Sequence, residues 1–316
     1  MYTKSFDVLV VGELNVDLIL DEIQGFPQVG KEIIARALNI TLGSSSAIFA
    51  SNLSSFGCSV AFLGKIGQDH FSNLIRSSLQ SKKVHTDYII SSEQYSTGLT
   101  VVMNYDMDRA NVTYPGAMEQ LREEEVTDII MSKCRHLHLS SIFLQTSLIE
   151  KAANLFKRAK KLGLTTSMDP QWDPSEEWRL NLEALLPHID IFMPNAEEFK
   201  CLTGREELSQ GLEIISDFAK VVVIKDGVNG AHLWKAGKLI SRPAFLNNNV
   251  IDCIGAGDSF DAGFIGEFLK GESLERCLEV GNVMGAINTV APGGTTAFKD
   301  LDHIKDIAQT RFSFTL

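Results

Sequence analysis

The regular alternation of short apolar runs with amphipathic stretches constrains the fold of this chain more than any other sequence feature. The first run, Val8–Val11, is continuously apolar and ends at Gly12, which is typical of a strand buried on both faces of a parallel sheet. The segments HLHLSSIF, TTSMDP, IDIFMPN and VVVIKDG predict further strands, and SSAIFASNLSSFG, SLIEKAANLFKRAKKLG and GLEIISDFAK predict helices. This order predicts an α/β fold with a mainly parallel central sheet flanked by helices.

Two stretches depart from this alternation, at about residues 13–42 and 97–114. The second, which includes TGLTVVMNYDMDRANVTY, has the alternation of a strand but no partner helix. We expect the two stretches to pair as a small β-sheet lid over a single domain formed by residues 1–316. No internal repeat or low-complexity linker interrupts the chain.

Composition excludes several classes of function. The chain of 316 residues has a formal net charge of -11, which argues against a general nucleic-acid or anionic-membrane binder. No run approaches the roughly 18 apolar residues of a membrane span, and the N-terminal segment resembles a strand more than a signal peptide. The five cysteines are scattered and are expected to be free thiols, so a cytoplasmic location is predicted.

A glycine loop followed by an aspartate carries the strongest chemical signal, in DCIGAGDSFDAGFIGEFLKG (residues 252–271). Phenylalanines recur every four residues from Phe260, so Gly255-Ala256-Gly257 is expected to lead into a helix N-terminus, whose free N–H groups attract phosphate. Asp258 could simply cap this helix, or it could act as a base beside the bound anion. The second arrangement suits phosphoryl transfer. No Walker P-loop is present, and the spacing fits a dinucleotide fingerprint poorly.

The segment DCIGAGDSFDAG resembles the C-terminal signature of the ribokinase-like, or PfkB-type, carbohydrate kinases, D-T-x-G-A-G-D-x-F-x-x-G, with Cys253 in place of threonine. The resemblance extends over nearly the whole chain. It implies a ribokinase-like fold and transfer of the γ-phosphoryl group of ATP to a hydroxyl of a small sugar or sugar-like acceptor. Asp258 would then be the general base, and the amides from Gly255, Ala256 and Gly257 to Asp258 would form the anion hole.

The same resemblance implies where the acceptor binds. In GELNVD, Asp17 matches a carboxylate that binds sugar hydroxyls, and Asn15 lies close to it. A carboxylate suits vicinal hydroxyls because it accepts two hydrogen bonds at once. The backbone of Gly43, Ser44 and Ser45 would hold the other side of the acceptor.

On the nucleotide side, the resemblance assigns five positions. Asn195 and Glu198 would lie near Mg²⁺ and the phosphates, with Glu198 acting through water. Lys225 and Gly227 would lie near the phosphates or the ribose, and Asn282 near the adenine.

Two assignments concern cations and assembly. A monovalent-cation site, for K⁺, would lie near Asp252 and Ile254. A homodimer formed through the lid is expected by analogy with relatives.

The departures from the family pattern lie at the acceptor end. Ile48 stands where an asparagine commonly touches the sugar, and the element D-x-N-x-R becomes Asp169-Pro170-Gln171-Trp172-Asp173, with aspartate in place of arginine. Two alternatives therefore stay open: a nucleoside kinase of the same family, and a non-catalytic sugar-binding regulator with the same fold.

Overall fold

The computed structural model describes residues 4–105 and 108–316. Its main sheet has the strand order β14-β13-β12-β11-β10-β9-β1-β4. The pairs from β4 to β12 are parallel, and β13 and β14 are added antiparallel at one edge. The strands are β1 (Phe6–Val11), β4 (Val60–Leu63), β9 (Cys134–Ser140), β10 (Thr165–Asp169), β11 (Ile191–Phe192), β12 (Val221–Lys225), β13 (Ala231–Lys235) and β14 (Lys238–Arg242).

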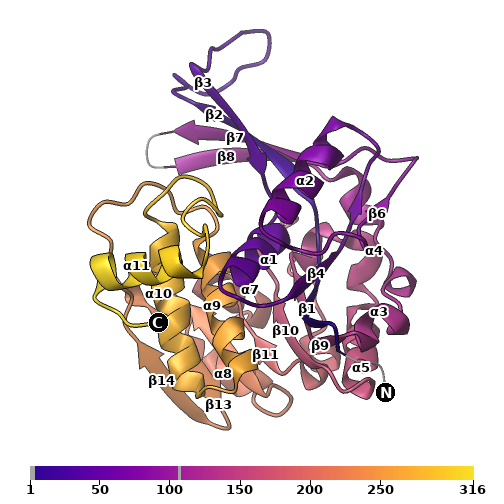
Figure 1. Cartoon of the computed structure of the whole chain (residues 1–316), viewed down its shortest axis with the longest axis vertical. Helices are drawn as coiled ribbons and strands as arrows, with labels where there is room; N and C mark the ends of the chain where they lie inside the picture. Colours follow the sequence, from indigo (N-terminus) through magenta and orange to yellow (C-terminus); the bar gives the residue numbers. More distant parts are fainter. Residues whose placement is uncertain (1–3, 106–107) are drawn as a thin grey trace.

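Helices cover both faces of this sheet (Figure 1). Strand β1 shows why its sequence is apolar throughout: Val8 and Val10 enter one hydrophobic core, while Leu9 and Val11 enter the other. The first core includes side chains of α1 (Ser45–Ser55), α2 (His70–Ser81), α9 (Ala256–Lys270) and α10 (Leu274–Asn288). The second includes α3 (Asp128–Ser132), α5 (Ala152–Lys161), α6 (Leu182–Leu185), α7 (Ala196–Thr203) and α8 (Leu208–Ile215). The predicted α/β fold with a mainly parallel sheet is confirmed.

A separate small sheet stands at one end of the main body (Figure 1). Its strand order is β3-β2-β7-β8, with β2 parallel to β7 and the other pairs antiparallel. The strands are β2 (Asn15–Asp21), β3 (Ala37–Leu42), β7 (Gly98–Tyr105) and β8 (Asp108–Tyr114), and all four fall within the two stretches expected to form a lid.

The two faces of the small sheet differ in chemistry. In the β2–β7 register, Asn15 and Asp17 share a face with Thr100, and this polar face looks into the large cleft described below. Leu18, one position along from Asp17, pairs with Ile40 and Val101 on the opposite face, which is apolar. Period-2 alternation thus gives one face suited to a polar ligand and one suited to an apolar contact.

One predicted helix is interrupted. The segment SLIEKAANLFKRAKKLG forms α4 (Thr146–Ile149) and α5, separated by a turn at Glu150 and Lys151. The short strands β5 (Lys65–Ile66) and β6 (Ile90–Ser91) pair with each other, and α11 (Leu301–Phe312) is the C-terminal α-helix. Among the described residues, no helix combines the length and the apolar character needed to cross a membrane.

Candidate active site

Polar residues gather where the parallel strands end. Glu13 follows β1, Asp169 ends β10, Asn195 follows β11 and Lys225 ends β12. Because the carboxyl ends of parallel strands meet at one edge of a sheet, these side chains from distant parts of the sequence share one site. A cleft of about 1640 Å³ opens there, and residues of the small sheet's polar face line its other wall.

The glycine loop brings the first turn of α9 into this cleft. The helix begins at Ala256, and its N-cap is Gly255 in the left-handed region, with φ 79°. Asp258 is therefore the third helical residue rather than the cap, which corrects the capping interpretation. The first-turn amides of Gly257 and Asp258 have no helical carbonyl to bind, so they and the positive end of the helix dipole are suited to an anion.

Asp258 is nearly buried and lies among other carboxylates. Its Oδ1 accepts a hydrogen bond of 2.9 Å from Nε2 of Gln171. Burial raises the pKa of Asp258 well above its usual range, and repulsion from Asp169 adds to this, whereas attraction to Lys225 and a hydrogen bond from Ser45 oppose it. The carboxyl is thus a better proton acceptor than an ordinary aspartate.

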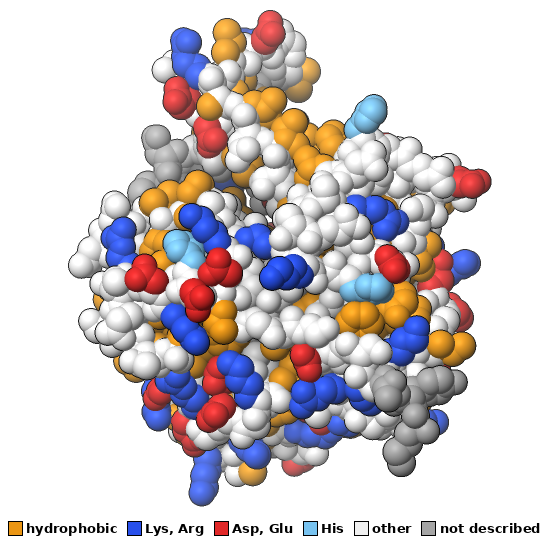
Figure 2. Space-filling model, viewed as in Figure 1, with side chains coloured by type: hydrophobic (Ala, Val, Ile, Leu, Met, Phe, Trp, Pro, Cys, Tyr) orange, Lys and Arg blue, Asp and Glu red, His pale blue; other side chains and the backbone are white. Residues whose placement is uncertain are grey.

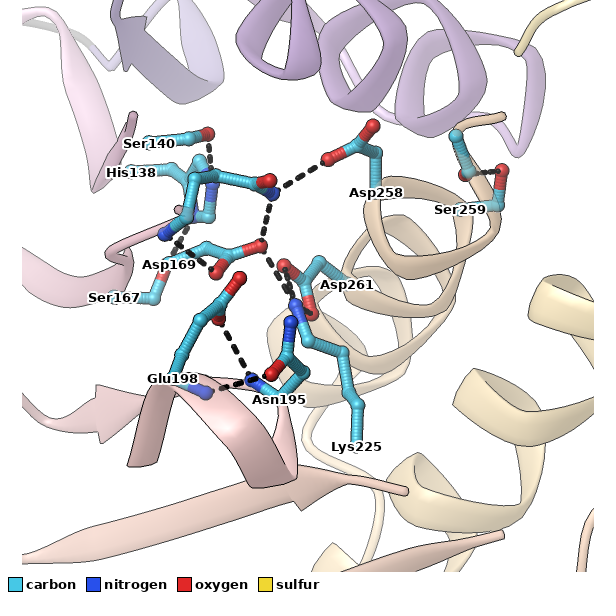
Figure 3. A network of polar contacts seen from close by, with 12 residues as sticks. His138, Ser140, Ser167, Asp169, Asn195, Glu198, Lys225, Asp258, Ser259 and Asp261 are labelled. Atoms are coloured by element: carbon cyan, nitrogen blue, oxygen red, sulfur yellow. Dashed lines mark hydrogen bonds and ion pairs between the residues drawn. The ribbon is translucent and has the colours of Figure 1, made fainter. Parts of the chain in front are cut away.

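Lys225 lies close to Gly257 of the glycine loop. It is the centre of an ion-pair cluster with Asp169 and Asp261 (Figure 3). Its Nζ lies 2.6 Å from Oδ2 of Asp169 and 3.1 Å from Oδ2 of Asp261. Burial alone would lower the pKa of Lys225, but attraction to Asp169 and Asp261 outweighs burial and raises the pKa. Burial also raises the pKa of Asp261 well above its usual range, and attraction to Lys225 counteracts this. The sequence predicts Lys225 near the phosphates or the ribose, and that role stays a prediction; the structure shows its ammonium paired with two carboxylates.

Glu198 and Asn195 form the start of α7. Asn195 is the N-cap, and its side chain accepts from the amide of Glu198, while Oε2 of Glu198 accepts from the amide of Asn195 at 2.8 Å. Burial, followed by repulsion from Asp169, raises the pKa of Glu198 to about 7. The described residues contain no cluster of three or more His, Cys, Asp or Glu side chains that could hold a metal ion directly. The role expected of Glu198, near Mg²⁺ through water, stays a prediction.

At the acceptor end, Asn15 and Asp17 lie side by side. Nδ2 of Asn15 donates to Oδ1 of Asp17 at 2.8 Å and to Oγ1 of Thr100 at 2.9 Å. Burial raises the pKa of Asp17 to about 6, opposed by the Asn15 hydrogen bond and by Arg109. Gly43 packs so closely against them that a Cβ would overlap the Asp17 carboxylate, which explains a glycine at this position.

Two serines lie at the start of α1, near the acceptor-side residues. Ser44 caps α1, with its Oγ accepting from the amide of Ala47 at 2.9 Å and donating to the carbonyl of Glu13 at 2.7 Å. Ser45 lines the cleft and hydrogen-bonds to Asp258. Of the predicted acceptor residues, Asn15, Asp17, Ser44 and Ser45 line the same cleft as Asp258, whereas Gly43 is not among the lining residues.

The departures from the family pattern have local structural consequences. Ile48 lines the cleft but is only 4% exposed, because it packs against Gly255 and Gly294. It therefore supports the glycine loop as well as bordering the cleft. Asp173, in the position of the arginine, accepts hydrogen bonds from the amides of Ser175 and Trp178 and orders its own loop.

The remaining predicted positions are distributed as follows. Gly227 and Asn282 line the cleft, and Nδ2 of Asn282 donates to the carbonyl of Pro243 at 3.2 Å. Asp252 is not among the lining residues; its carboxylate accepts from the amides of Ile254 and Gly293. The carbonyl of Ile254 accepts from Nδ2 of Asn288 at 2.6 Å. The roles of these residues in binding adenine or a monovalent cation stay predictions.

Sequence reasoning assigned no role to four residues of the site: Glu13, Asp169, Gln171 and Asp261. Glu13 is buried, accepts from the amide and hydroxyl of Ser46, and has its pKa raised to about 6 by burial. A signal existed for Asp261, which lies one helical turn after Asp258 and so faces the same way. For Gln171, no residue pattern indicated that its side chain reaches Asp258.

Comparison with known proteins decides the family. The model of the pfkB family of carbohydrate kinases matches residues 5–301. The chain belongs to this family. It is 24% identical over 311 residues to an ATP-dependent 6-phosphofructokinase from Thermoanaerobacterium thermosaccharolyticum, covering 96% of this chain and 94% of the relative. It is thus related to carbohydrate kinases over nearly its full length.

Solved structures agree with the fold of this pfkB family member. Ribokinase from Arabidopsis thaliana, solved with ribose and ATP, superposes with a TM-score of 0.84 at 25% identity, covering 96% of this chain and 98% of that one. The Escherichia coli protein designated ribokinase II, solved with ATP and Mg²⁺, gives a TM-score of 0.84 at 22% identity, covering 96% and 99%. The ribokinase-like fold is thereby confirmed, and the chain is a kinase of the carbohydrate type.

Proposed function

We propose that this chain transfers the γ-phosphoryl group of ATP to a hydroxyl of a small sugar or sugar-like acceptor. The observation that carries the proposal is the position of Asp258 in the first turn of α9, between the loop amides and the acceptor-side residues of the same cleft. A carboxylate next to amides that suit an anion can accept a proton from an attacking hydroxyl while the amides stabilise the transferred group.

In the proposed reaction, Asn15 and Asp17 hold hydroxyls of the acceptor, and the backbone of Gly43 to Ser45 closes the other side. The attacking hydroxyl gives its proton to the Asp258 carboxylate as its oxygen forms a bond to the γ-phosphorus. The bond between the γ-phosphorus and the bridging oxygen breaks, and ADP leaves. The amides of the glycine loop stabilise the charge on the transferred group. The small sheet excludes water, so that ATP is not hydrolysed.

The charge of the cleft supports a requirement for a divalent cation. Four buried acidic side chains (Asp169, Glu198, Asp258 and Asp261) interact with the ammonium of Lys225, and a fifth, Glu13, interacts with Asp258. A tetra-anionic nucleotide would be repelled from this site unless its charge were reduced. Mg²⁺ would supply the positive charge that reduces the repulsion, and Asn195 and Glu198 would hold its water shell.

The apolar outer face of the small sheet supports a homodimer. Leu38, Ile40, Val112 and Tyr114 lie on the face opposite Asp17 and are at least 43% exposed. Figure 2 shows hydrophobic side chains gathered on the small sheet. A contiguous apolar patch on a sheet is typical of an interaction surface, and a second copy of the same sheet would cover it with a complementary one.

A coupled ADP-release assay across a panel of sugars and nucleosides tests the proposal. With a turned-over acceptor, Asp258→Asn is expected to lower kcat by roughly 10²–10⁴, the range for general acid–base catalysis, without weakening ATP binding. Asp190→Asn is a matched control, because Asp190 lies at the amino end of β11 and pairs with Lys160 and Lys220. Equal turnover by Asp258→Asn and wild type would contradict the assignment, and saturable sugar binding without turnover would favour a regulator.

A further inference from the structure

We propose that Gln171 is a positioning residue that holds the catalytic carboxylate of Asp258 in place and keeps it ionised. This inference rests on the proposed role of Asp258 as the base. It adds a residue whose part in the reaction the sequence does not reveal.

The geometry singles out the side-chain amide of Gln171. Its Nε2 donates to Oδ1 of Asp258 at 2.9 Å and to Oδ2 of Asp169 at 2.6 Å. Both hydrogens of one NH₂ group are thus directed at two different carboxylates. Asp169 is in turn held by Nζ of Lys225 at 2.6 Å. A continuous chain of contacts therefore runs from the base to the buried ammonium.

The backbone at Gln171 is held in an uncommon conformation. Its φ is 60°, in the left-handed region that non-glycine residues seldom adopt. Downstream, Asp173 accepts from Oγ of Ser175 at 2.7 Å and from the amide of Trp178 at 2.7 Å, which orders the loop. Such a conformation persists only where the surrounding structure fixes it. The contacts of this loop thus fix the position of the Gln171 side-chain amide.

Two donors account for the orientation of the Asp258 carboxylate. Gln171 binds its Oδ1, and Ser45 provides a second hydrogen bond from the acceptor-side loop. A donor to an ionised carboxylate stabilises the charged form, which is the form that a base requires. Removing the Gln171 donor should therefore make Asp258 harder to ionise. The charged groups that act on Asp258 from the elements packed around it are Asp169 from β10, Lys225 from β12, Glu13 after β1 and Asp261 from α9 itself.

The main test is Gln171→Met, which keeps the length of the side chain and removes both donors. In a plot of kcat against pH, the rise on the acidic side is expected to move to higher pH by about one to two units. A shift of this size corresponds to the free energy of one hydrogen bond to a charged group. At the alkaline plateau kcat should return to within a few-fold of wild type, and KM for ATP should not change. If Gln171 had only a structural role, Gln171→Met would lower kcat at every pH without changing the pH at which kcat rises.

A second readout does not depend on turnover. The carboxyl ¹³C signal of Asp258, in protein labelled at aspartate and assigned by its absence in Asp258→Asn, should titrate one to two pH units higher in Gln171→Met than in wild type. If the wild-type enzyme turns over no acceptor, the kinase proposal fails, while this titration still decides the role of Gln171.

Controls separate this role from the loss of any buried amide. Gln145→Met removes a buried glutamine that donates to the carbonyl of Ser140 at 2.8 Å and has no contact with Asp258 among those described. This variant should change neither the pH at which kcat rises nor the pH at which the Asp258 signal titrates. Gln171→Asn shortens the side chain by one methylene and should shift the kcat rise and the Asp258 titration in the same direction as Gln171→Met. It replaces Gln171→Met in these measurements if that variant does not fold. The proposal would be overturned if a folded Gln171 variant showed the same pH for the kcat rise and the same titration of the Asp258 carboxyl signal as wild type.

Discussion

Replacing Lys225 by methionine tests whether the buried cluster is held together by charge. Methionine keeps the length of the side chain but removes the ammonium that contacts Asp169 and Asp261, each about 1% exposed. Removing one partner of a buried ion pair typically costs about 3–5 kcal/mol, because the remaining charge stays buried without compensation. We therefore expect the free energy of unfolding to fall by about 3–5 kcal/mol at pH 8.

The pH dependence has a definite sign. Burial already raises the pKa of Asp261, and the attraction of Lys225 is what limits that rise. Without Lys225 the pKa of Asp261 rises further, so the folded variant binds a proton that the unfolded chain releases at neutral pH. Stability then falls as pH rises. The loss should be smallest near pH 5 and should grow toward pH 8.

Urea unfolding of wild type and Lys225→Met at pH 5, 6.5 and 8 measures this difference. Asp261→Asn in the Lys225→Met background is the matched rescue, because it removes one of the two buried charges left without a partner. The double variant should lose less than the sum of the single losses, by about 0.5–3 kcal/mol. A loss below about 1 kcal/mol that does not depend on pH would refute the reasoning.

Two further predictions concern the glycine loop and the small sheet. Gly255→Ala should lower stability by more than about 1–2 kcal/mol, the cost of a left-handed non-glycine residue, because its Cβ would lie 2.8 Å from Cα of Gly294. Gly271→Ala is the control in thermal unfolding, because Gly271 has φ 85° but no atom near its Cβ position, so only the conformational cost should lower its stability. Equal losses of stability in the two variants would show that the contact with Gly294 does not matter. Ile40→Lys should convert the expected homodimer to monomer in sedimentation velocity, whereas Ile129→Lys, which changes an equally apolar exposed residue on α3, should not. A monomeric wild type, or a dimer unaffected by Ile40→Lys, would exclude this interface.

The local features of this protein follow from its sequence. Continuous apolar strands such as Val8–Val11 predict a sheet covered on both faces, because each successive side chain must enter one core or the other. The glycine loop before Phe260 predicts a helix N-terminus suited to an anion, since backbone conformation and the spacing of apolar residues are local properties. The two stretches without partner helices likewise predicted a separate sheet.

What the tertiary structure alone decided is which distant residues meet. Gln171 lies 87 residues from Asp258 along the chain, and Lys225 lies 56 residues from Asp169, so no sequence spacing could reveal either contact. The carboxyl ends of parallel strands and the first turn of α9 bring these side chains together at one edge of the sheet. The raised pKa of Asp258 depends on desolvation and on neighbours from β10 and β12. The sequence by itself determined the type of chemistry, and the packing of remote strands determined the electrostatic environment in which that chemistry would occur.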